Sequence, residues 1–309
     1  MTRAVLLVAN AQAGTAEDEA IDAARAALAE RAEVEVARPA EPAELERVLS
    51  RLGERMLVVA GGDGSIHVVV RTLLRHDPSR LAGTAIGLIP LGTGNDLASG
   101  LGIPTDPVEA ARVCLAGTVR RLDLFTTDQG EVVVNAAHAG LGAAAAERSE
   151  GMKASLGALS YPLGAMIAGV REAGWDLVVT VDEARVHDGK TLMVGIANAP
   201  CIGGGARLCM RAKPDDGLLD VVVVSAVGPA ARIAFGVALR GATHLDRDDV
   251  LHLRGRAVTI AGERVAHDLD GELVGELESC TYTVRPGAWR LVAPTPPESA
   301  RLEQSPAPA

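Results

Sequence analysis

Two short segments combine glycines with a hydroxyl group and a carboxylate, about 30 residues apart. They are residues 61–65 (GGDGS) and residues 92–96 (GTGND). Glycines let backbone amides approach a phosphate closely, and the dipole of a helix that begins at such a turn favours an anion. Asp63 would repel that phosphate unless a divalent cation lay between them. The two turns therefore predict a shared phosphate site that uses magnesium.

Neither turn matches a common nucleotide-binding motif. Residues 61–65 do not fit G-x-x-x-x-G-K-[ST], and they do not complete G-x-G-x-x-G because His67 stands where the last glycine should be. Taken alone, the first turn is equally well a tight strand-to-helix connection. The second turn favours the phosphate site, because two such turns on neighbouring strands would face one crevice.

Several carboxylates later in the chain are also candidates. Asp123 lies near the middle of the chain, and Asp-Gly pairs occur at 216–217 and 270–271. In a β-rich region such pairs most often form hairpin turns, and that interpretation stays open. Glu272 is the better candidate for chemistry, since a carboxylate in a cleft between domains could accept the proton of an attacking hydroxyl group.

Strands and helices alternate in the first half of the chain, and they must position the two turns. Apolar runs predict buried strands at 4–9, 33–37, 56–60 and 85–89, with helices at 15–30, 42–52 and after residue 65. Such alternation predicts a parallel sheet with helices on both faces, a three-layer α/β/α domain. Both turns then lie at the carboxyl ends of strands, where ligands bind in this class of sheet.

The pattern changes at about residue 120, where short Val-rich segments begin. They lie at 121–125, 131–138, 176–181, 191–198, 218–224, 250–253, 257–261, 280–284 and 290–292, mostly separated by turns such as 188–189. This predicts an antiparallel β-sandwich, interrupted by helices near 141–170 and 229–239. We therefore expect a nucleotide-binding α/β domain (1–122), a β-sandwich substrate domain (123–293), an active site in the cleft between them and a flexible Pro/Ala-rich tail (294–309).

Composition restricts the class of partner. The 309 residues carry a net charge of −10 and only 2% aromatic residues, which argues against a nucleic-acid partner. The four cysteines have no CxxC spacing, so neither a zinc site nor a disulfide framework is indicated, and a reducing cytoplasm fits. The apolar run at 4–9 is shorter than a signal peptide usually requires, and no segment approaches the roughly 20 apolar residues of a membrane span.

Together these motifs resemble the diacylglycerol kinase catalytic-domain family, which includes soluble bacterial lipid kinases and sphingosine kinases and, more distantly, NAD kinases. The resemblance covers residues 3–293. It rests on residues 10–14, 61–65, 90–96, 123, 135–140, 153–161, 215–219 and 270–272, in family order. The most specific combination is GTGND followed much later by Asp-Gly-Glu.

The resemblance implies roles for particular residues. ATP-contacting positions would be Asn10, Gly14, Gly61, Gly62, Asp63, Gly64, Ser65, Ile66, His67, Gly92, Thr93, Gly94 and Asn95, with Arg38 near the adenosine. Glu272 would be the proton acceptor supported by Asp270, and Asp63, Asp96 and Asp123 would organise the catalytic magnesium and its waters. Asp216, with the backbone carbonyls of Lys213 and Leu218, would form a structural magnesium site.

The implied activity is that of an ATP- and magnesium-dependent kinase that phosphorylates a hydroxyl group of a lipid or lipid-like acceptor of the diacylglycerol type. We expect a cytoplasmic protein, in peripheral contact with the inner face of the membrane and able to form a homodimer. Two alternatives stay open: a kinase of a soluble acceptor such as NAD or a sugar phosphate, and a nucleotide-binding regulatory protein with reduced activity. The apolar segment 141–170 suits an acyl-chain groove, although a stretch of this kind is more often ordinary core.

The sequence departs from the family pattern at a few positions. Ala11 replaces a proline, Ser65 replaces a threonine, and Ser99 replaces an arginine. His67 and Val68 replace an asparagine and a glutamate just after the first turn. These two changes predict either an altered nucleotide site or, for His67, a histidine on the helix surface.

Overall fold

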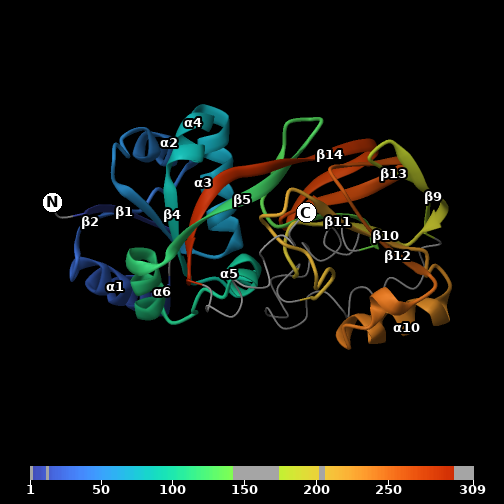
Figure 1. The fold of residues 1–309 in the computed structure, drawn as a ribbon, viewed down its shortest axis with the longest axis horizontal. Helices are drawn as coiled ribbons and strands as arrows, with labels where there is room; N and C mark the ends of the chain where they lie inside the picture. The colour runs from blue at the N-terminus through green and yellow to red at the C-terminus, as the bar shows by residue number, and fades with distance from the viewer. Residues whose placement is uncertain (1–2, 12–13, 142–173, 202–205, 296–309) are drawn as a thin grey trace, which may run out of the picture.

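The structure is a computed structural model that describes residues 3–11, 14–141, 174–201 and 206–295. The helix expected near 141–170, with its apolar groove, and nearly all of the tail lie outside the described residues. Figure 1 shows a layered α/β domain beside a β-rich domain, with β5 and β14 running between them.

The N-terminal domain is a parallel sheet with helices on both faces, as predicted. Its strand order is β4-β3-β1-β2 and every pair is parallel. The strands are β1 (Arg3–Ala9), β2 (Ala32–Ala37), β3 (Met56–Gly61) and β4 (Ala85–Pro90). The helices are α1 (Thr15–Ala29), α2 (Pro42–Ser50), α3 (Asp63–His76), α4 (Pro78–Gly83), α5 (Asp96–Leu101) and α6 (Pro107–Ala116). All six residues of β3 are buried, since helices cover both faces.

The C-terminal domain is an antiparallel, sandwich-like β domain, also as predicted. Its strands are β5 (Thr118–Thr127), β6 (Val132–Val133), β7 (Ala136–Gly140), β8 (Trp175–Val181), β9 (Ala184–Thr191), β10 (Met193–Ala197), β11 (Leu219–Val224), β12 (Val250–Gly255), β13 (Ala257–Leu269) and β14 (Glu272–Ala293). Helix α10 (Pro229–Arg240) and a short 3₁₀ helix, η2 (His244–Asp246), cover one side. Valine, leucine and isoleucine side chains form its core, with Phe125 and Tyr282 packed edge to face.

The structure corrects three details of the strand prediction. Segments 280–284 and 290–292 belong to one long strand, β14. Strand β9 was not predicted, and Gly189 pairs with Leu177 inside it instead of forming a hairpin turn. The 131–138 segment is split into β6 and β7, because residues between them donate their N–H groups to a side chain. Local alternation indicates a strand but does not determine its partner or register.

Strand β14 connects the two domains. Near its carboxyl end, Arg290 and Leu291 pair in parallel with Ala85 and Ile86 of β4, while β5 pairs antiparallel with the same stretch. Trp289 lies in the apolar core of the N-terminal domain. The division at residues 122 and 123 stays a prediction, and β5 runs through it. Of the helices that the structure describes, none has the length and apolarity needed to span a membrane.

Candidate functional site

The two glycine turns lie side by side at the carboxyl ends of β3 and β4. Gly61 is in register with Pro90, and the Leu91 N–H donates to the Gly61 carbonyl at 3.2 Å. Backbone packs directly against backbone between the turns, since a Cβ atom on Gly92 would lie 2.5 Å from the Gly62 Cα. Glycines at these two positions are therefore required by contact between the turns, a reason that the sequence pattern did not reveal.

Replacing Gly92 by alanine should destabilise the protein by about 1–3 kcal/mol, because the new methyl group meets main chain that cannot move aside as a side chain could. Gly64→Ala is the matched control, since a Cβ there has no neighbour within 4 Å. It should leave the free energy of unfolding unchanged or slightly raised. Urea unfolding of both variants checks this, and equal stabilities would contradict the packing explanation.

Asp63 connects the first turn to the second. Its Oδ2 accepts the Asp96 N–H at 2.9 Å and its Oδ1 accepts the Leu97 N–H at 3.1 Å, so this carboxylate caps the first turn of α5. Asn95 shapes the second turn in a left-handed conformation (φ 52°), with its side chain accepting from and donating to the Gly92 backbone at 3.0 and 2.6 Å. Each Asp63 oxygen keeps a further lone pair for another ligand.

A cavity of about 260 Å³ lies beside the first turn. Its lining includes Asn10, Pro39, Gly64, Ser65 and Val68. The cavity thus joins the carboxyl end of β1 to the start of α3, as expected for a ligand site in a parallel sheet. Val68 makes part of the wall apolar where the family pattern has a carboxylate.

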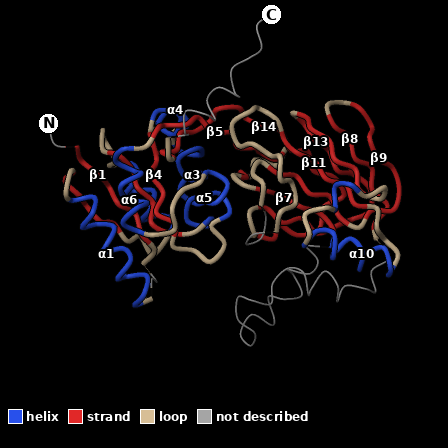
Figure 2. The backbone as a smooth tube through the Cα atoms, turned by 60° about the horizontal axis from the view of Figure 1, so that its bottom comes forward, coloured by secondary structure: helices blue, strands red, loops and turns tan. Residues whose placement is uncertain are grey.

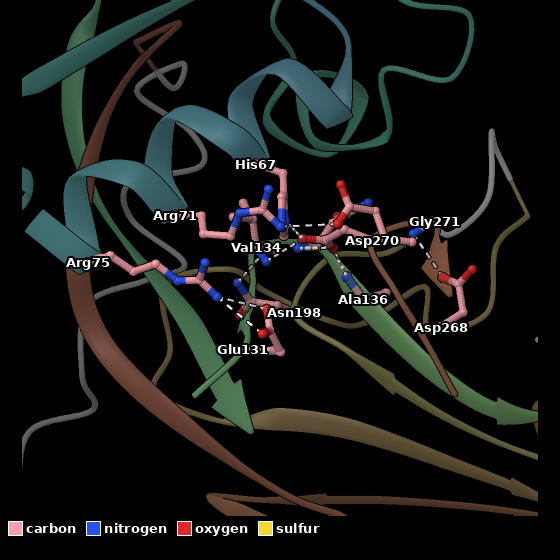
Figure 3. Close-up of polar contacts among 12 residues, drawn as sticks. His67, Arg71, Arg75, Glu131, Val134, Ala136, Asn198, Asp268, Asp270 and Gly271 are labelled. Carbon is pink, nitrogen blue, oxygen red and sulfur yellow. Dashed lines mark hydrogen bonds and ion pairs between the residues drawn. The ribbon is translucent and has the colours of Figure 1, made fainter. Parts of the chain in front are cut away.

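Three side chains on one face of α3 reach across to the C-terminal domain (Figure 3). His67 Nδ1 lies 2.7 Å from Asp270 Oδ2, and Arg71 Nη1 lies 3.1 Å from Glu272 Oε2. Arg75 Nη2 lies 3.0 Å from an oxygen of Glu131. Residues four apart share one helix face, so this face pairs with three carboxylates of the other domain. We call His67, Arg71 and Arg75 the α3 stripe.

The α3 stripe excludes one of the two alternatives for His67 and adds residues that were not predicted. His67 is only 3% exposed, so the interpretation as a surface histidine is wrong. Because a carboxylate accepts hydrogen bonds, we assign the proton to His67 Nδ1, which then donates to Asp270 Oδ2. Arg71, Arg75 and Glu131 were missed; the four-residue spacing after His67 was the available signal.

Asp270 is a buried anchor. Its Oδ1 accepts the N–H groups of Asn135 and Ala136, both at 2.9 Å, and its Oδ2 accepts the Val134 N–H at 2.7 Å in addition to His67. Four donors fill the lone pairs of the carboxylate, and its side chain is 2% exposed. Asp270 therefore holds the segment before β7 and the helix α3 together.

Glu272 lies in a different environment, although it is only two residues away. Its side chain is 54% exposed, and Arg71 is the partner that the structure shows. Of the two carboxylates at the β13–β14 turn, Glu272 is the exposed one, and its role as a base stays a prediction. This contrast supports the separate roles expected for the two residues.

Asp123 lies against the 213–218 loop. Its two oxygens accept the N–H groups of Gly217 and Gly287 at 2.6 and 2.7 Å, and its main-chain N–H donates to the Pro214 carbonyl. Burial raises the pKa of the Asp123 carboxyl group, and those two N–H donors oppose the rise. Over the described ranges, no three His, Cys, Asp or Glu side chains gather as a metal site, so Asp63, Asp96 and Asp123 do not form one direct ligand set.

Asp216 is balanced by a side chain of this chain. Arg254 pairs with its Oδ2, and its Oδ1 accepts the Leu218 N–H at 3.1 Å. Arg254 Nε also lies 3.4 Å from Asp220, which is almost fully buried. A guanidinium group thus supplies positive charge at the position where the resemblance implies structural magnesium.

Comparison with known proteins follows the same division. Residues 4–127 match the diacylglycerol kinase catalytic domain, and residues 135–293 match the YegS C-terminal NAD kinase beta sandwich-like domain. A protein of Stenotrophomonas maltophilia (strain K279a) named "Probable lipid kinase YegS-like" is 34% identical over 235 residues, 72% of this chain and 74% of that protein. A protein of the same name from Xanthomonas oryzae pv. oryzae (strain MAFF 311018) is 30% identical over 250 residues, 75% of this chain and 78% of its own.

A solved structure of a diacylglycerol kinase from Bacillus anthracis str. Sterne shares the fold. Its TM-score is 0.71 at 22% sequence identity, and the match covers 94% of this chain and 97% of that one. Both domains are therefore arranged in a way already seen in a solved structure.

Proposed function

Because the chain belongs to the YegS-like lipid kinases of the diacylglycerol kinase catalytic-domain family, we propose that it transfers the γ-phosphate of ATP to a hydroxyl group of a lipid acceptor of the diacylglycerol type. One observation carries the proposal. The exposed carboxylate of Glu272 lies across from α3, the helix that begins at the first glycine turn, and Arg71 of that helix holds it at 3.1 Å. The proposed base is thus in contact with the helix that begins at the proposed phosphate-binding turn.

The residues on both sides of the cleft have complementary tasks. Bound ATP would supply the phosphoryl group, and magnesium would offset its charge. Glu272 would accept the proton of the acceptor hydroxyl group while the hydroxyl oxygen bonds to the γ-phosphorus and the bond from that phosphorus to ADP breaks. Asp270 and His67 keep the β13–β14 turn against α3. The backbone of residues 61–65 and the N-terminal end of α3 stabilise negative charge on the phosphate.

The residues present suit ATP and a catalytic magnesium ion, but they do not suit a structural metal ion at Asp216. The space beside Gly64 is open and the adjoining cavity is lined by Asn10 and Ser65, which suits ATP. Asp63 is only half-buried and retains lone pairs, so it suits a magnesium ion close to the phosphates. At Asp216, by contrast, a metal ion would have to displace the Arg254 guanidinium group.

A kinase assay with γ-labelled ATP and magnesium tests the proposed activity. The acceptors are diacylglycerol, a sphingoid base, phosphatidylglycerol, a polyprenol and NAD. We expect a labelled lipid product and no labelled NAD. Labelled NAD alone would replace the lipid kinase by a kinase of a soluble acceptor. Absence of any product would favour the regulatory nucleotide-binding alternative.

We also propose a cytoplasmic location at the inner face of the membrane.

Replacing Asp63 by alanine should raise the magnesium concentration needed for half-maximal activity about tenfold, because a carboxylate that attracts the ion is lost. The same change removes the cap of α5, at a cost of about 1 kcal/mol. Asp106→Ala is the matched control. Asp106 caps α6 by accepting the Glu109 N–H at 2.9 Å, and it belongs to none of the proposed sites. Titration of activity with magnesium distinguishes the two variants. Equal magnesium concentrations at half-maximal activity would contradict the role of Asp63.

A further inference from the structure

One part of the C-terminal domain has a charge opposite to that of the whole chain. It consists of residues 206–213 and residues 228–245, which include α10; we call these two segments the basic face. Both segments lack Asp and Glu, although the chain carries a net charge of −10. Their basic side chains are Arg207, Arg211, Lys213, Arg232 and Arg240.

Packing joins the two segments of the basic face. Leu208 and Cys209 lie in the same apolar core as Phe235 of α10, and the Leu208 carbonyl contacts His244 Nε2 at 2.7 Å. These buried contacts hold the loop against the end of α10. The basic groups that remain exposed are Arg207, Arg211, Lys213 and Arg240.

Exposed apolar side chains lie among these basic groups. Met210 is 41% exposed, Ile233 is 51% exposed and Val237 is 66% exposed. Ile233 and Val237 lie four residues apart and therefore project from the same face of α10. A helix with exposed aliphatic side chains and basic neighbours is typical of helices that lie in the interface of a membrane, where anionic lipids attract the arginines.

An anionic membrane fits this surface better than a second copy of the chain does. In a symmetric dimer the same patch would meet itself, and two basic faces would repel each other. A bilayer that contains anionic lipid supplies both an apolar layer and negative charge. The acid-free sequence of both segments suits this partner.

The chain just before the basic face, at residues 200 and 201, lies against α5 and the segment before β7. The Cys201 carbonyl accepts from Asn135 Nδ2 at 3.4 Å, and a Cβ on Gly100 of α5 would lie 3.2 Å from Pro200. Burial raises the pKa of Cys201 most, Asp96 raises it further and Arg207 lowers it, so the second glycine turn and the basic face both lie within electrostatic reach of this thiol. In Figure 1, α5 and α10 both lie in the lower half of the molecule; in Figure 2, α5 lies near the middle and α10 on the β-rich domain.

We propose that the basic face docks on an anionic membrane surface and so brings the cleft to an acceptor embedded in the bilayer. The purpose of docking rests on the proposed lipid kinase function, whereas the docking itself does not require turnover. Co-sedimentation without ATP tests it, using phosphatidylcholine vesicles with and without phosphatidylglycerol. We expect binding only to the anionic vesicles, weakened by added salt.

Two double variants locate the surface. Arg211→Gln with Arg240→Gln should lower the vesicle affinity about fivefold for each charge removed. Ile233→Ser with Val237→Ser should also weaken binding, through lost apolar burial. Arg112→Gln with Val119→Ser is the control, because these residues are exposed outside the basic face, on α6 and at the start of β5. The Arg112 side chain is 61% exposed and Val119 is 47% exposed, and the binding of this variant should be unchanged.

Equal binding to neutral and anionic vesicles would overturn the proposal, and so would equal vesicle affinities of all three double variants. A concentration-dependent dimer that the basic-face variants abolish, while their vesicle binding persists, would overturn it as well. Activity on a short-chain, dispersed acceptor should be unchanged in Arg211→Gln with Arg240→Gln. A protein that binds vesicles but phosphorylates nothing would contradict only the proposed function. A protein that phosphorylates the dispersed acceptor but ignores vesicles would contradict only the docking.

Discussion

Replacing Glu272 by glutamine should lower kcat by about 10²–10⁴-fold, because an amide of the same shape cannot accept the proton of the acceptor hydroxyl group. The binding of ATP should be largely kept, since Glu272 begins β14 of the C-terminal domain, whereas the glycine turns follow β3 and β4 of the N-terminal domain. Steady-state kinetics with the lipid acceptor and calorimetric titration with ATP measure the two effects separately. A variant with unchanged kcat would exclude Glu272 as the base.

Glu131→Gln is the control for this experiment. Glu131 also pairs with an arginine of the α3 stripe, Arg75, one helical turn after the Arg71 that holds Glu272. The two glutamates therefore make the same kind of contact between the domains, but only Glu272 adjoins the Asp270 turn. Glu131→Gln should change kcat by no more than about twofold, since an exposed ion pair contributes little. A large loss in both variants would indicate that contact between the domains matters, and not proton transfer.

Replacing Asp270 by asparagine should destabilise the protein by about 3–5 kcal/mol, the cost of breaking a buried, fully hydrogen-bonded charge. The carboxylate now accepts hydrogen bonds from donors that include the Val134 N–H and His67 Nδ1. In the variant, the amide NH₂ group would face some of these donors and could not accept from them. Urea unfolding measures the loss. Activity should fall as well, because the β13–β14 turn that carries Glu272 would no longer be held against α3.

Asp182→Asn is the matched control for Asp270→Asn. Asp182 also has a positive φ in a hairpin turn, 46° against 51° for Asp270, and its carboxylate also accepts backbone N–H groups, from Arg256 and Ala257. Asp182 is exposed, however, so water can replace a lost hydrogen bond, and we expect a cost of about 1 kcal/mol. Similar losses in the two variants would contradict the interpretation that burial makes Asp270 an anchor.

Much of the N-terminal domain was predictable from the sequence. The predicted strands 4–9, 56–60 and 85–89 agree with β1, β3 and β4 to within one residue at each end. Such agreement is expected, because buried parallel strands appear as continuous apolar runs and glycine turns follow them directly. The family resemblance depended on the same local motifs, read in order along the chain.

Prediction was weaker in the C-terminal domain. Strand β9 has an exposed, polar sequence without clear alternation, and the Asp-Gly pair inside it imitates a hairpin turn. Strand β14 continues through Pro286 and Gly287, two residues that normally end a strand, because it shifts register there as it passes from one domain to the other. Neighbours far away in the chain determine both features.

The sequence by itself determined which residues can do chemistry: two glycine turns with carboxylates, and a late Asp-Gly-Glu. Only the tertiary structure decided how the carboxylates are used. Asp63 caps a helix 33 residues later, and Asp270 meets His67 across 203 residues of sequence, while Glu272 stays exposed beside Arg71. Residue type and spacing report local backbone geometry, whereas the partners and burial of a carboxylate depend on how segments far apart in the sequence pack against each other.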